Sequence, residues 1–364
     1  MLVADVHPGP QDSRLRKLTV AAGYLFFVAQ VNEYGWELWR SDGTEAGTIL
    51  VKDIHPGSGS SGVDELTAFG EFLFFVAHDG VNHDQLWRSD GTEPGTLVVS
   101  ASVRSPESLV EVDGTLFFIG RDLAGEVGLW KTDGTRAGTV QVKSIDGGRL
   151  TNVAGTLFLV ANDDVHGSEL WTSDGTEAGT TMVKDLTPGP GGSHISSLTP
   201  VGRHVYCIAD SGDLGLELLR SDGTEAGTFF VKDIFPGPKD GRLELGVAAN
   251  GLLFFEAVDE IDPDYGAREE LWRSDGTEVG TFSLGISFRF VAANVTAIRP
   301  RLTRSREELL FGRLRRTDGT LEGTTDGLAV AAGPKTVVGT TIFFSGGTYL
   351  EGTELWALDL PLDD

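Results

Sequence analysis

The sequence predicts an all-β fold: an eight-bladed β-propeller of four-stranded blades, closed by the N-terminal strand completing the last blade. The first observation behind this prediction is a motif of the form ELWRSDGTEAGT that recurs along the 364 residues. The second is its period of 41 to 53 residues, which is typical of propellers and solenoids. The Asp of each Asp-Gly-Thr triplet marks one repeat: Asp42, Asp90, Asp133, Asp174, Asp222, Asp275 and Asp318.

The third observation is that every repeat contains four short apolar segments. In the first repeat they read LTVAAG, YLFFVAQ, WELWRSD and TILVKDI, each bounded by Gly, Asn, Asp or Pro. Such runs, rich in Val, Ile, Leu, Phe, Trp and Thr, predict strands, and four strands in about 45 residues predict a propeller blade. Six of the seven tryptophans share one repeat position, which predicts packing between blades.

The two ends of the chain decide the expected blade number. The last repeat stops before its fourth strand, and LVADVHPG at Leu2–Gly9 resembles the fourth-strand segment LVKDIHPG at Leu50–Gly57. We therefore expect the termini to pair, which would remove two open sheet edges; seven blades is the alternative. Residues 1–364 are expected to form one domain with blades at about 15–54, 63–102, 106–145, 148–186, 195–234, 243–285, 294–330 and 335–360 plus 1–7.

The SDGTEAGT stretch between the third and fourth strands is expected to be a structural turn. Glycine accepts a positive φ, and the Asp and Thr side chains can bond nearby backbone N–H groups. The alternative is a calcium or ligand site repeated in each blade.

With these motifs the chain resembles the bacterial ELWxxDGT-repeat proteins, also described as hyalin-like. The resemblance rests on ELW-R/T-SDGTEAGT followed by VKDI-PG, and it spans essentially the whole chain. It implies a propeller and an exported or cell-surface setting. It implies no catalytic residues.

The variable loops are expected to share one face of the propeller, called here the upper face. It carries the loops from second to third strands and the connections between blades, whereas the SDGT turns lie on the lower face. Binding residues concentrate on variable loops of rigid scaffolds. The candidate ligand-binding residues, aromatic and polar side chains that suit sugars, are Tyr34, Trp36, Asp84, Asp164, His166, Tyr265 and Tyr349.

Six of seven histidines fall in these upper loops. His7, His55, His78 and His83 belong to neighbouring blades and are candidate metal ligands, and His55, His78 and His83 with Asp79 are candidate acid–base catalysts. The cofactor prediction is accordingly a divalent metal, either calcium or a transition metal. Calcium would suit the acidic loop Asp259–Glu270, which nevertheless departs from the EF-hand pattern. The plainer interpretation is that polar loops collect histidines.

Composition narrows the partners and the location. Asp and Glu outnumber Lys and Arg by 54 to 29, and the net charge of −25 opposes binding to nucleic acid or anionic membranes. No apolar run reaches the roughly 20 residues of a membrane helix. We expect an exported, monomeric protein whose signal peptide is absent from this sequence. The single cysteine, Cys207, is expected to be buried.

Two functions remain open from the sequence. The first is a non-catalytic propeller that binds a glycan, a protein or a small molecule through the upper face. The alternative is an enzyme of the lyase, isomerase or hydrolase type, with a His/Asp site, with or without a metal, above the axial channel. Propellers support both kinds of function.

Overall fold

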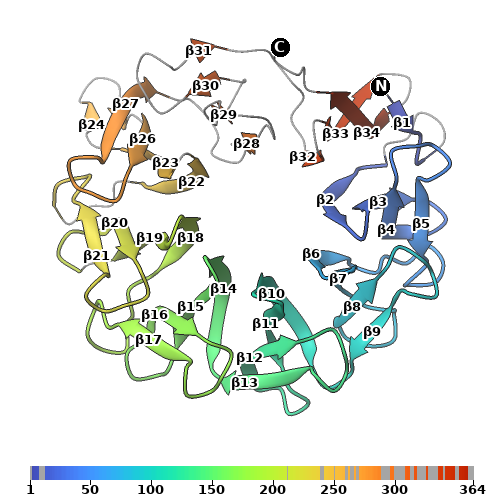
Figure 1. The fold of residues 1–364 in the computed structure, drawn as a ribbon, viewed down its shortest axis with the longest axis horizontal. Coiled ribbons are helices and arrows are strands. Elements are labelled where there is room, and N and C mark those ends of the chain that lie inside the picture. Colours follow the sequence, from blue (N-terminus) through green and yellow to red (C-terminus); the bar gives the residue numbers. More distant parts are fainter. Residues whose placement is uncertain are drawn as a thin grey trace. The chain divides into compact units, whose positions relative to one another are not determined.

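The computed structural model describes residues 2–7, 13–210, 212–237, 242–249, 251–258 and 270–287, together with short strands elsewhere. The described residues form six four-stranded antiparallel sheets, each from consecutive strands of one repeat (Figure 1). The prediction of an all-β chain with four strands per repeat is thus confirmed for six repeats. In the described part of the chain, no helix is long and apolar enough to cross a membrane.

The sheets are numbered in chain order, and each begins with its first strand along the sequence. Sheet 1 comprises β2 (Arg16–Ala21), β3 (Tyr24–Val31), β4 (Gly35–Ser41) and β5 (Ile49–Lys52). Sheet 2 comprises β6 (Asp64–Phe69), β7 (Phe72–Ala77), β8 (Gln85–Ser89) and β9 (Leu97–Ser100). Sheet 3 comprises β10 (Arg104–Val112), β11 (Thr115–Arg121), β12 (Val127–Thr132) and β13 (Val140–Ser144).

The next three sheets follow the same plan. Sheet 4 comprises β14 (Asp146–Val153), β15 (Thr156–Asn162), β16 (Ser168–Ser173) and β17 (Thr181–Lys184). Sheet 5 comprises β18 (Ser196–Val201), β19 (His204–Asp210), β20 (Leu216–Ser221) and β21 (Phe229–Lys232). Sheet 6 comprises β22 (Glu244–Ala249), β23 (Leu252–Ala257), β26 (Glu270–Ser274) and β27 (Phe282–Ser287), with the small pair β24 (Ile261–Asp262) and β25 (Gly266–Ala267).

The remaining strands have two to eight residues each. They are β1 (Leu2–Ala4), β28 (Thr296–Ile298), β29 (Glu308–Phe311), β30 (Arg315–Thr317), β31 (Thr325–Asp326), β32 (Lys335–Val338), β33 (Thr341–Thr348) and β34 (Gly352–Asp359).

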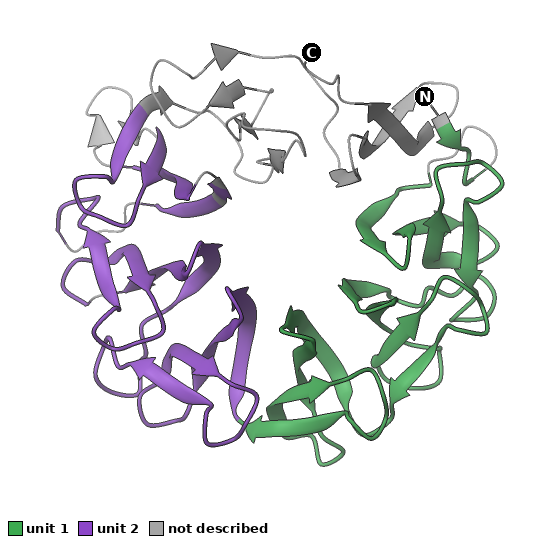
Figure 2. Ribbon diagram, in the orientation of Figure 1, with its two compact units in different colours: residues 1–144, 331–364 green, residues 145–330 purple. Residues whose placement is uncertain are grey.

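The chain divides into two compact units, residues 1–144 with 331–364 and residues 145–330 (Figure 2). In the first unit, the first strands of sheets 1, 2 and 3 lie side by side in that order. In the second unit, the first strands of sheets 4, 5 and 6 do the same.

Apolar side chains fill the space between neighbouring sheets. Phe26 and Val28 of sheet 1 share one buried cluster with Phe75 and Trp87 of sheet 2. The indole of Trp87 stacks on Phe75 with ring centroids 6.3 Å apart, and its Nε1 donates to the carbonyl of Ala77. The predicted role of the repeated tryptophan in packing between sheets is confirmed here. Cys207 is buried between sheets 4 and 5.

The SDGT loop is held by its own side chains. In sheet 1, Oδ1 of Asp42 accepts both the N–H and the hydroxyl of Thr44, at 2.9 and 2.6 Å. The Thr44 hydroxyl in turn accepts the N–H of Gly47. A Cβ on Gly47 would lie 1.9 Å from Asp42 Oδ1, so this position admits only glycine. These hydrogen bonds hold the pKa of the exposed Asp42 carboxyl below its usual range.

Two further hydroxyls close the loop. Thr48 donates to the carbonyl of Thr44, so Ser41 donates its own proton to the Thr48 hydroxyl and accepts the N–H of Gly43. Gly43 has a φ of +90°, which favours glycine. The same pattern recurs at 89–96, 132–139, 173–180, 221–228 and 274–281. The structural role predicted for the loop accounts for its repeated Ser, Asp, Gly and Thr residues.

Cations of one sheet also hold the SDGT loop of the next. Within the first unit, Lys52 donates to the carbonyl of Thr96 at 3.1 Å, and Arg88 donates to the carbonyl of Gly134 at 2.9 Å. Within the second unit, Arg220 donates to Gly276, and Lys184 and Lys232 donate to the carbonyls of Thr228 and Thr281. The motif therefore joins sheets as well as turning the chain.

The Glu of the ELW segment is a buried anchor for the connection between sheets. The carboxylate of Glu37 accepts the N–H groups of Ile54 and His55 and the hydroxyl of Ser61, the last at 2.7 Å. Its burial outweighs these three donors and raises the pKa of Glu37 to about 7. Glu169 repeats the arrangement with Ser193, and its pKa is also raised by burial.

Candidate functional site

The loops between second and third strands meet the connections between sheets at one edge of each sheet, called here the upper edge. His78 at the end of β7 donates its N–H to the carbonyl of Ser61, and Asp210 donates its N–H to the carbonyl of Ser193. Both bonds join a second strand to the segment that precedes its sheet. In sheets 2 and 5 the end of the second strand therefore lies beside the connection from the preceding sheet.

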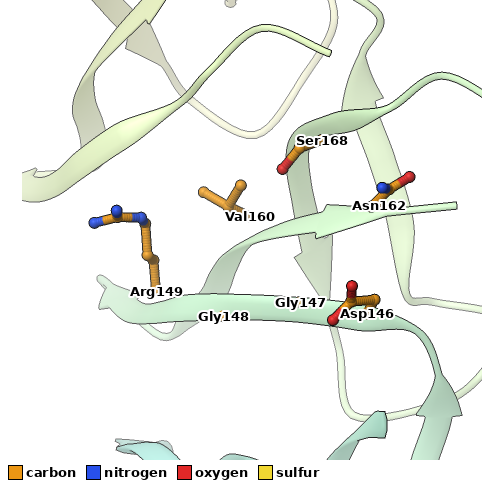
Figure 3. Close-up of a pocket in the computed structure, with 7 residues that line it drawn as sticks. All are labelled: Asp146, Gly147, Gly148, Arg149, Val160, Asn162 and Ser168. Atoms are coloured by element: carbon orange, nitrogen blue, oxygen red, sulfur yellow. The ribbon is translucent and has the colours of Figure 1, made fainter. Parts of the chain in front are cut away.

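A polar hollow of 260 Å³ lies at the upper edge of sheet 4 (Figure 3). Asp146, Asn162 and Ser168 are directly opposite one another across β14, β15 and β16, so their side chains share one face of the sheet. Two residues further along β14, and on the same face of the sheet, Gly148 pairs with Val160. The hollow is lined by Asp146, Gly147, Gly148, Arg149, Val160, Asn162 and Ser168.

The hollow exists because Gly148 has no side chain. Gly148 pairs with Val160 as Arg16 pairs with Val28 in sheet 1, so the two residues occupy the same register position. A Cβ on Gly148 would meet no atom within 4 Å. The other sheets place a larger residue there, namely Asp64, Glu107 and Ser196 in sheets 2, 3 and 5.

In sheet 1 the positions that correspond to Gly148 and Ser168 carry large side chains, and these fill the equivalent space. The guanidinium carbon of Arg16 lies 3.8 Å from the ring centroid of Trp36. Trp36 pairs with Gln30 as Ser168 pairs with Asn162, so Trp36 and Ser168 are equivalent. Trp36, a predicted ligand-binding residue, is half-buried and its ring face is covered by Arg16. Small residues at the matching positions leave the hollow in sheet 4 open.

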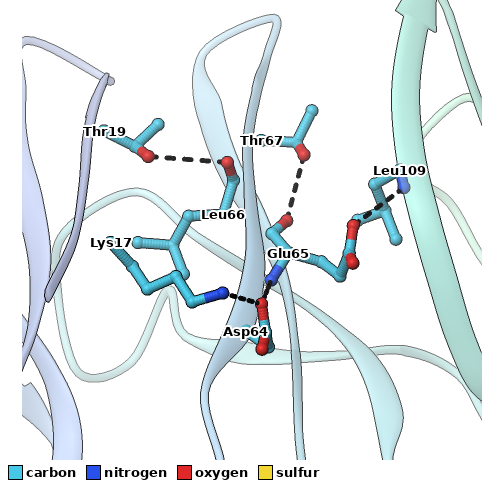
Figure 4. A network of polar contacts seen from close by, with 7 residues as sticks. All are labelled: Lys17, Thr19, Asp64, Glu65, Leu66, Thr67 and Leu109. Atoms are coloured by element: carbon cyan, nitrogen blue, oxygen red, sulfur yellow. Dashed lines mark hydrogen bonds and ion pairs between the residues drawn. The ribbon is translucent and has the colours of Figure 1, made fainter. Parts of the chain in front are cut away.

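Arg149 reaches the hollow through a β-bulge. The register of β14 shifts between Gly148 and Thr151, and Arg149 has a φ of +52°. In sheets 1 and 2 the equivalent residues Lys17 and Glu65 are tied to the next first strand (Figure 4). Lys17 donates to Asp64 at 2.6 Å, and Glu65 accepts the N–H of Leu109 at 3.2 Å. Among the described residues, Arg149 forms no such bond.

The β15–β16 loop beside the hollow carries a carboxylate–imidazole pair. Nδ1 of His166 lies 2.8 Å from Oδ2 of Asp163. The hydrogen bond to Asp163 raises the pKa of His166, and the pKa of Asp163 is lowered to about 2, chiefly by the backbone N–H of His166. Asp164, a predicted binding residue, is exposed and donates its N–H to Oδ1 of Asn162 at 2.8 Å.

Two of the predicted histidines lie together. The rings of His55 and His78 meet edge to face with centroids 5.3 Å apart. Nδ1 of His55 lies 3.1 Å from the carbonyl oxygen of Ser60. Its Nε2 is enclosed by Gly59 and Gly80, because a Cβ on either would lie 2.5 Å from that nitrogen. One nitrogen of His55 is therefore engaged in a hydrogen bond, and the other is packed against the two glycines.

The other predicted histidines and carboxylates lie elsewhere. Asp79 accepts the N–H groups of Val81 and Asn82 and the Asn82 amide, which lowers its pKa and commits it to its own turn. His83 and Asp84 are exposed, whereas His7 is buried.

The remaining predicted site features can be placed as follows. Tyr34 is half-buried in the β3–β4 turn. Tyr265 and Tyr349 lie outside the described residues, as does most of the predicted calcium loop at 259–270. Within the described part of the chain, no three His, Cys, Asp or Glu side chains are grouped as metal ligands.

The sequence predicted binding residues on the β15–β16 loop but not the residues that line the hollow beside it. Asp146, Gly148 and Arg149 belong to DGGR, which reads as a connection between repeats. The signal available was the pair of glycines where the other first strands carry side chains.

Comparison with solved structures finds similar folds. Oligopeptidase B from Leishmania major is 12% identical with a TM-score of 0.53, covering 86% of this chain and 48% of that one. A puromycin-hydrolyzing peptidase from Mycobacterium tuberculosis is 13% identical with a TM-score of 0.47, covering 82% and 50%. The β-propeller domain of the Trilobed protease from Pyrococcus furiosus is 10% identical with a TM-score of 0.44, covering 75% and 85%.

At these identities the likeness concerns the fold alone. The six consecutive four-stranded sheets have a β-propeller repeat architecture, and the chain spans about half the length of the two peptidases. No family model and no curated protein matches the chain.

Proposed function

We propose that this chain is a non-catalytic β-propeller that binds a glycan through the upper edge of its sheets. The observation that carries the proposal is the hollow of sheet 4, lined by a carboxylate, an amide, a hydroxyl and a guanidinium. These groups together donate and accept hydrogen bonds, as sugar hydroxyls also do. Its volume of 260 Å³ lies below the range of about 300–1,000 Å³ that suits drug-sized ligands, so a single sugar unit is a suitable occupant.

The test fills the hollow with the pair found in sheet 1. Gly148→Arg combined with Ser168→Trp reproduces the positions of Arg16 and Trp36. Wild-type protein is expected to retain a set of glycans on an array, and the filled variant is expected to lose them. Gly191→Arg is the matched control, since it adds a cation at an exposed glycine with open space around it.

The control should bind as the wild type does, and thermal unfolding should show that both variants fold. An array on which folded wild-type protein and the filled variant give the same pattern would refute this site. A protein ligand is the other outcome within the same proposal, and it would appear as retention of a polypeptide that the filled variant does not bind.

One observation favours the alternative, an enzyme. The Asp163–His166 pair, 2.8 Å apart, borders the hollow and has the carboxylate–imidazole arrangement of a general base with its orienting group. Turnover of an array-identified glycan that is lost in His166→Gln, with binding retained, would support catalysis. Unchanged glycan after prolonged incubation supports the binding function.

For the whole chain we propose eight blades closed by the N-terminal strand. The antiparallel pairing of β1 with β34, with Leu2 opposite Trp356, supports the proposal. The net charge of −25 and the resemblance support a monomer that works outside the cytoplasm. A disulfide between cysteines introduced at Leu2 and Trp356 should form in a closed propeller and should be absent from an open one.

A further inference from the structure

We propose that the hollow of sheet 4 selects a sugar acid, with the sugar carboxylate on Arg149 and the hydroxyls on Asp146, Asn162 and Ser168. This inference rests on the proposed glycan-binding function and specifies its ligand. Arg149 lies at one end of the hollow and Asp146 at the other (Figure 3).

The guanidinium of Arg149 is uncommitted. The bulge residues Lys17 and Glu65 join neighbouring first strands, but Arg149 has no ion pair or hydrogen bond within the described part of the chain. The planar guanidinium matches a carboxylate with two parallel hydrogen bonds. A bulge residue with this chemistry, facing an open hollow, is suited to an anionic group of a ligand.

The paired side chains of Asp146, Asn162 and Ser168 determine which hydroxyls of a ligand can bind. Oδ1 of Asn162 already accepts the N–H of Asp164, so the amide presents its NH₂ group to a ligand as a donor. Asp146 can only accept when ionised, and the Ser168 hydroxyl can do both. Neighbouring strands lie about 4.8 Å apart, so the three groups suit hydroxyls spread across a sugar ring, not hydroxyls on adjacent carbons.

Asp146 also fixes the orientation of the ligand. Its carboxylate would repel the sugar carboxylate, so the acid group is directed to the Arg149 end of the hollow. Gly148 and Val160 lie between the two ends, and the exposed edge of the Val160 side chain is an apolar contact for the C–H face of the ring. The site thus has separate places for an acid, for hydroxyls and for an apolar ring face.

The net charge of −25 does not oppose this local preference. Charges further away than about 8 Å are largely screened at physiological ionic strength. A single sugar acid on Arg149 therefore responds mainly to the nearby guanidinium, whereas a long polyanion would meet the acidic surface over its whole length.

The experiment is an isothermal titration calorimetry measurement in which methyl glucuronide or methyl glucoside is added to the full chain. The two sugars differ only in the acid group. Wild-type protein is expected to bind the glucuronide at least about tenfold more tightly, as a charge-assisted hydrogen bond implies. Arg149→Met is expected to reduce glucuronide affinity to that of the glucoside. Arg121→Met, which removes an exposed cation at the end of β11 in sheet 3, is the matched control and should leave both affinities unchanged.

If both sugars bind equally well and the Gly148→Arg/Ser168→Trp variant loses both, glycan binding stands and the selection of an acid is wrong. If the glucuronide binds equally well to wild type and to Arg149→Met, the assigned place of the carboxylate is wrong. If neither sugar binds the folded wild type while other glycans are retained on the array and lost in the filled variant, the sugar-acid inference alone is overturned.

Discussion

The guanidinium of Arg88 in β8 donates to the carbonyl of Gly134, 2.9 Å away in the SDGT loop of the following sheet. The same guanidinium lies 4.6 Å from the ring centroid of Phe72. A side chain of one sheet therefore holds the turn of the next, and the repeated loop acts as a joint between sheets as well as a turn.

Removing this joint should destabilise the protein. Arg88→Met keeps the apolar stem but loses the donor to Gly134, and we expect the free energy of unfolding to fall by about 1–2 kcal/mol. Urea unfolding followed by tryptophan fluorescence measures the change. Arg121→Met removes a guanidinium whose hydrogen bond, to the carbonyl of Gly125, stays within the exposed β11–β12 loop, and it should change the free energy by less than about 0.5 kcal/mol. Equal losses for both variants would argue against a joint.

Gly95 should not tolerate a methyl group. A Cβ there would lie 2.1 Å from Oδ1 of Asp90, so Gly95→Ala must push the loop apart, at a cost of about 1–3 kcal/mol. Thermal unfolding measures the loss. Gly191→Ala, with no atom within 4 Å of its Cβ, is the control and should be neutral. On an Asp90→Ala background the cost of Gly95→Ala should shrink; a full cost there would mean that Asp90 is not the obstacle.

Stability should depend on pH through Glu37. Burial raises its pKa in the folded protein to about 7, from an ordinary value of 4.5. The folded protein therefore holds a proton that the unfolded chain has released. Its contribution is fully present below about pH 4.5 and is lost as the pH rises to about 7. The free energy of unfolding, measured at pH 5 and pH 8, should fall across this range.

The matched variant is Glu37→Gln, which copies the residue that sheet 2 carries at the same register position, Gln85. It removes the titrating group, so the pH dependence of unfolding should be smaller than in the wild type by about 3 kcal/mol or less. A variant with the wild-type slope would show that other carboxyl groups cause the dependence.

The pKa of His166 should respond to Asp163. The hydrogen bond to the Asp163 carboxylate raises the pKa of this imidazole above its ordinary value, so Asp163→Asn should lower it. An NMR titration of the His166 ring protons measures the shift. Asp164→Asn, at the neighbouring exposed carboxylate, is the control and should move the titration much less. Equal shifts would assign the effect to net charge and not to the hydrogen bond.

Much of the fold was predictable from the sequence because it depends on local pattern. Apolar runs of strand length, punctuated by Gly and Asp, specify four strands per repeat. The SDGT loop was predictable for the same reason, since its bonds join residues no more than seven positions apart, such as Ser41 and Thr48. The hydrogen bond from Arg88 to Gly134 was not predictable from local pattern, because it joins positions 46 residues apart.

The candidate site was predicted only in part. The loop with Asp164 and His166 was expected at the upper edge, and it borders the hollow. Trp36 has the chemistry of a sugar-binding residue, but Arg16 covers its ring. Which aromatic ring is free depends on a neighbour 20 residues away, and no local pattern reports that.

The sequence by itself determined the repeated sheet and its loop, because strand alternation and short-range hydrogen bonds are properties of neighbouring residues. Only the tertiary structure decided where a ligand can enter. The hollow depends on Gly148 standing where sheet 1 has Arg16, and on strand pairing that aligns Asp146, Asn162 and Ser168. Such a space is defined by what three strands leave unfilled, and that becomes visible only when their register is known.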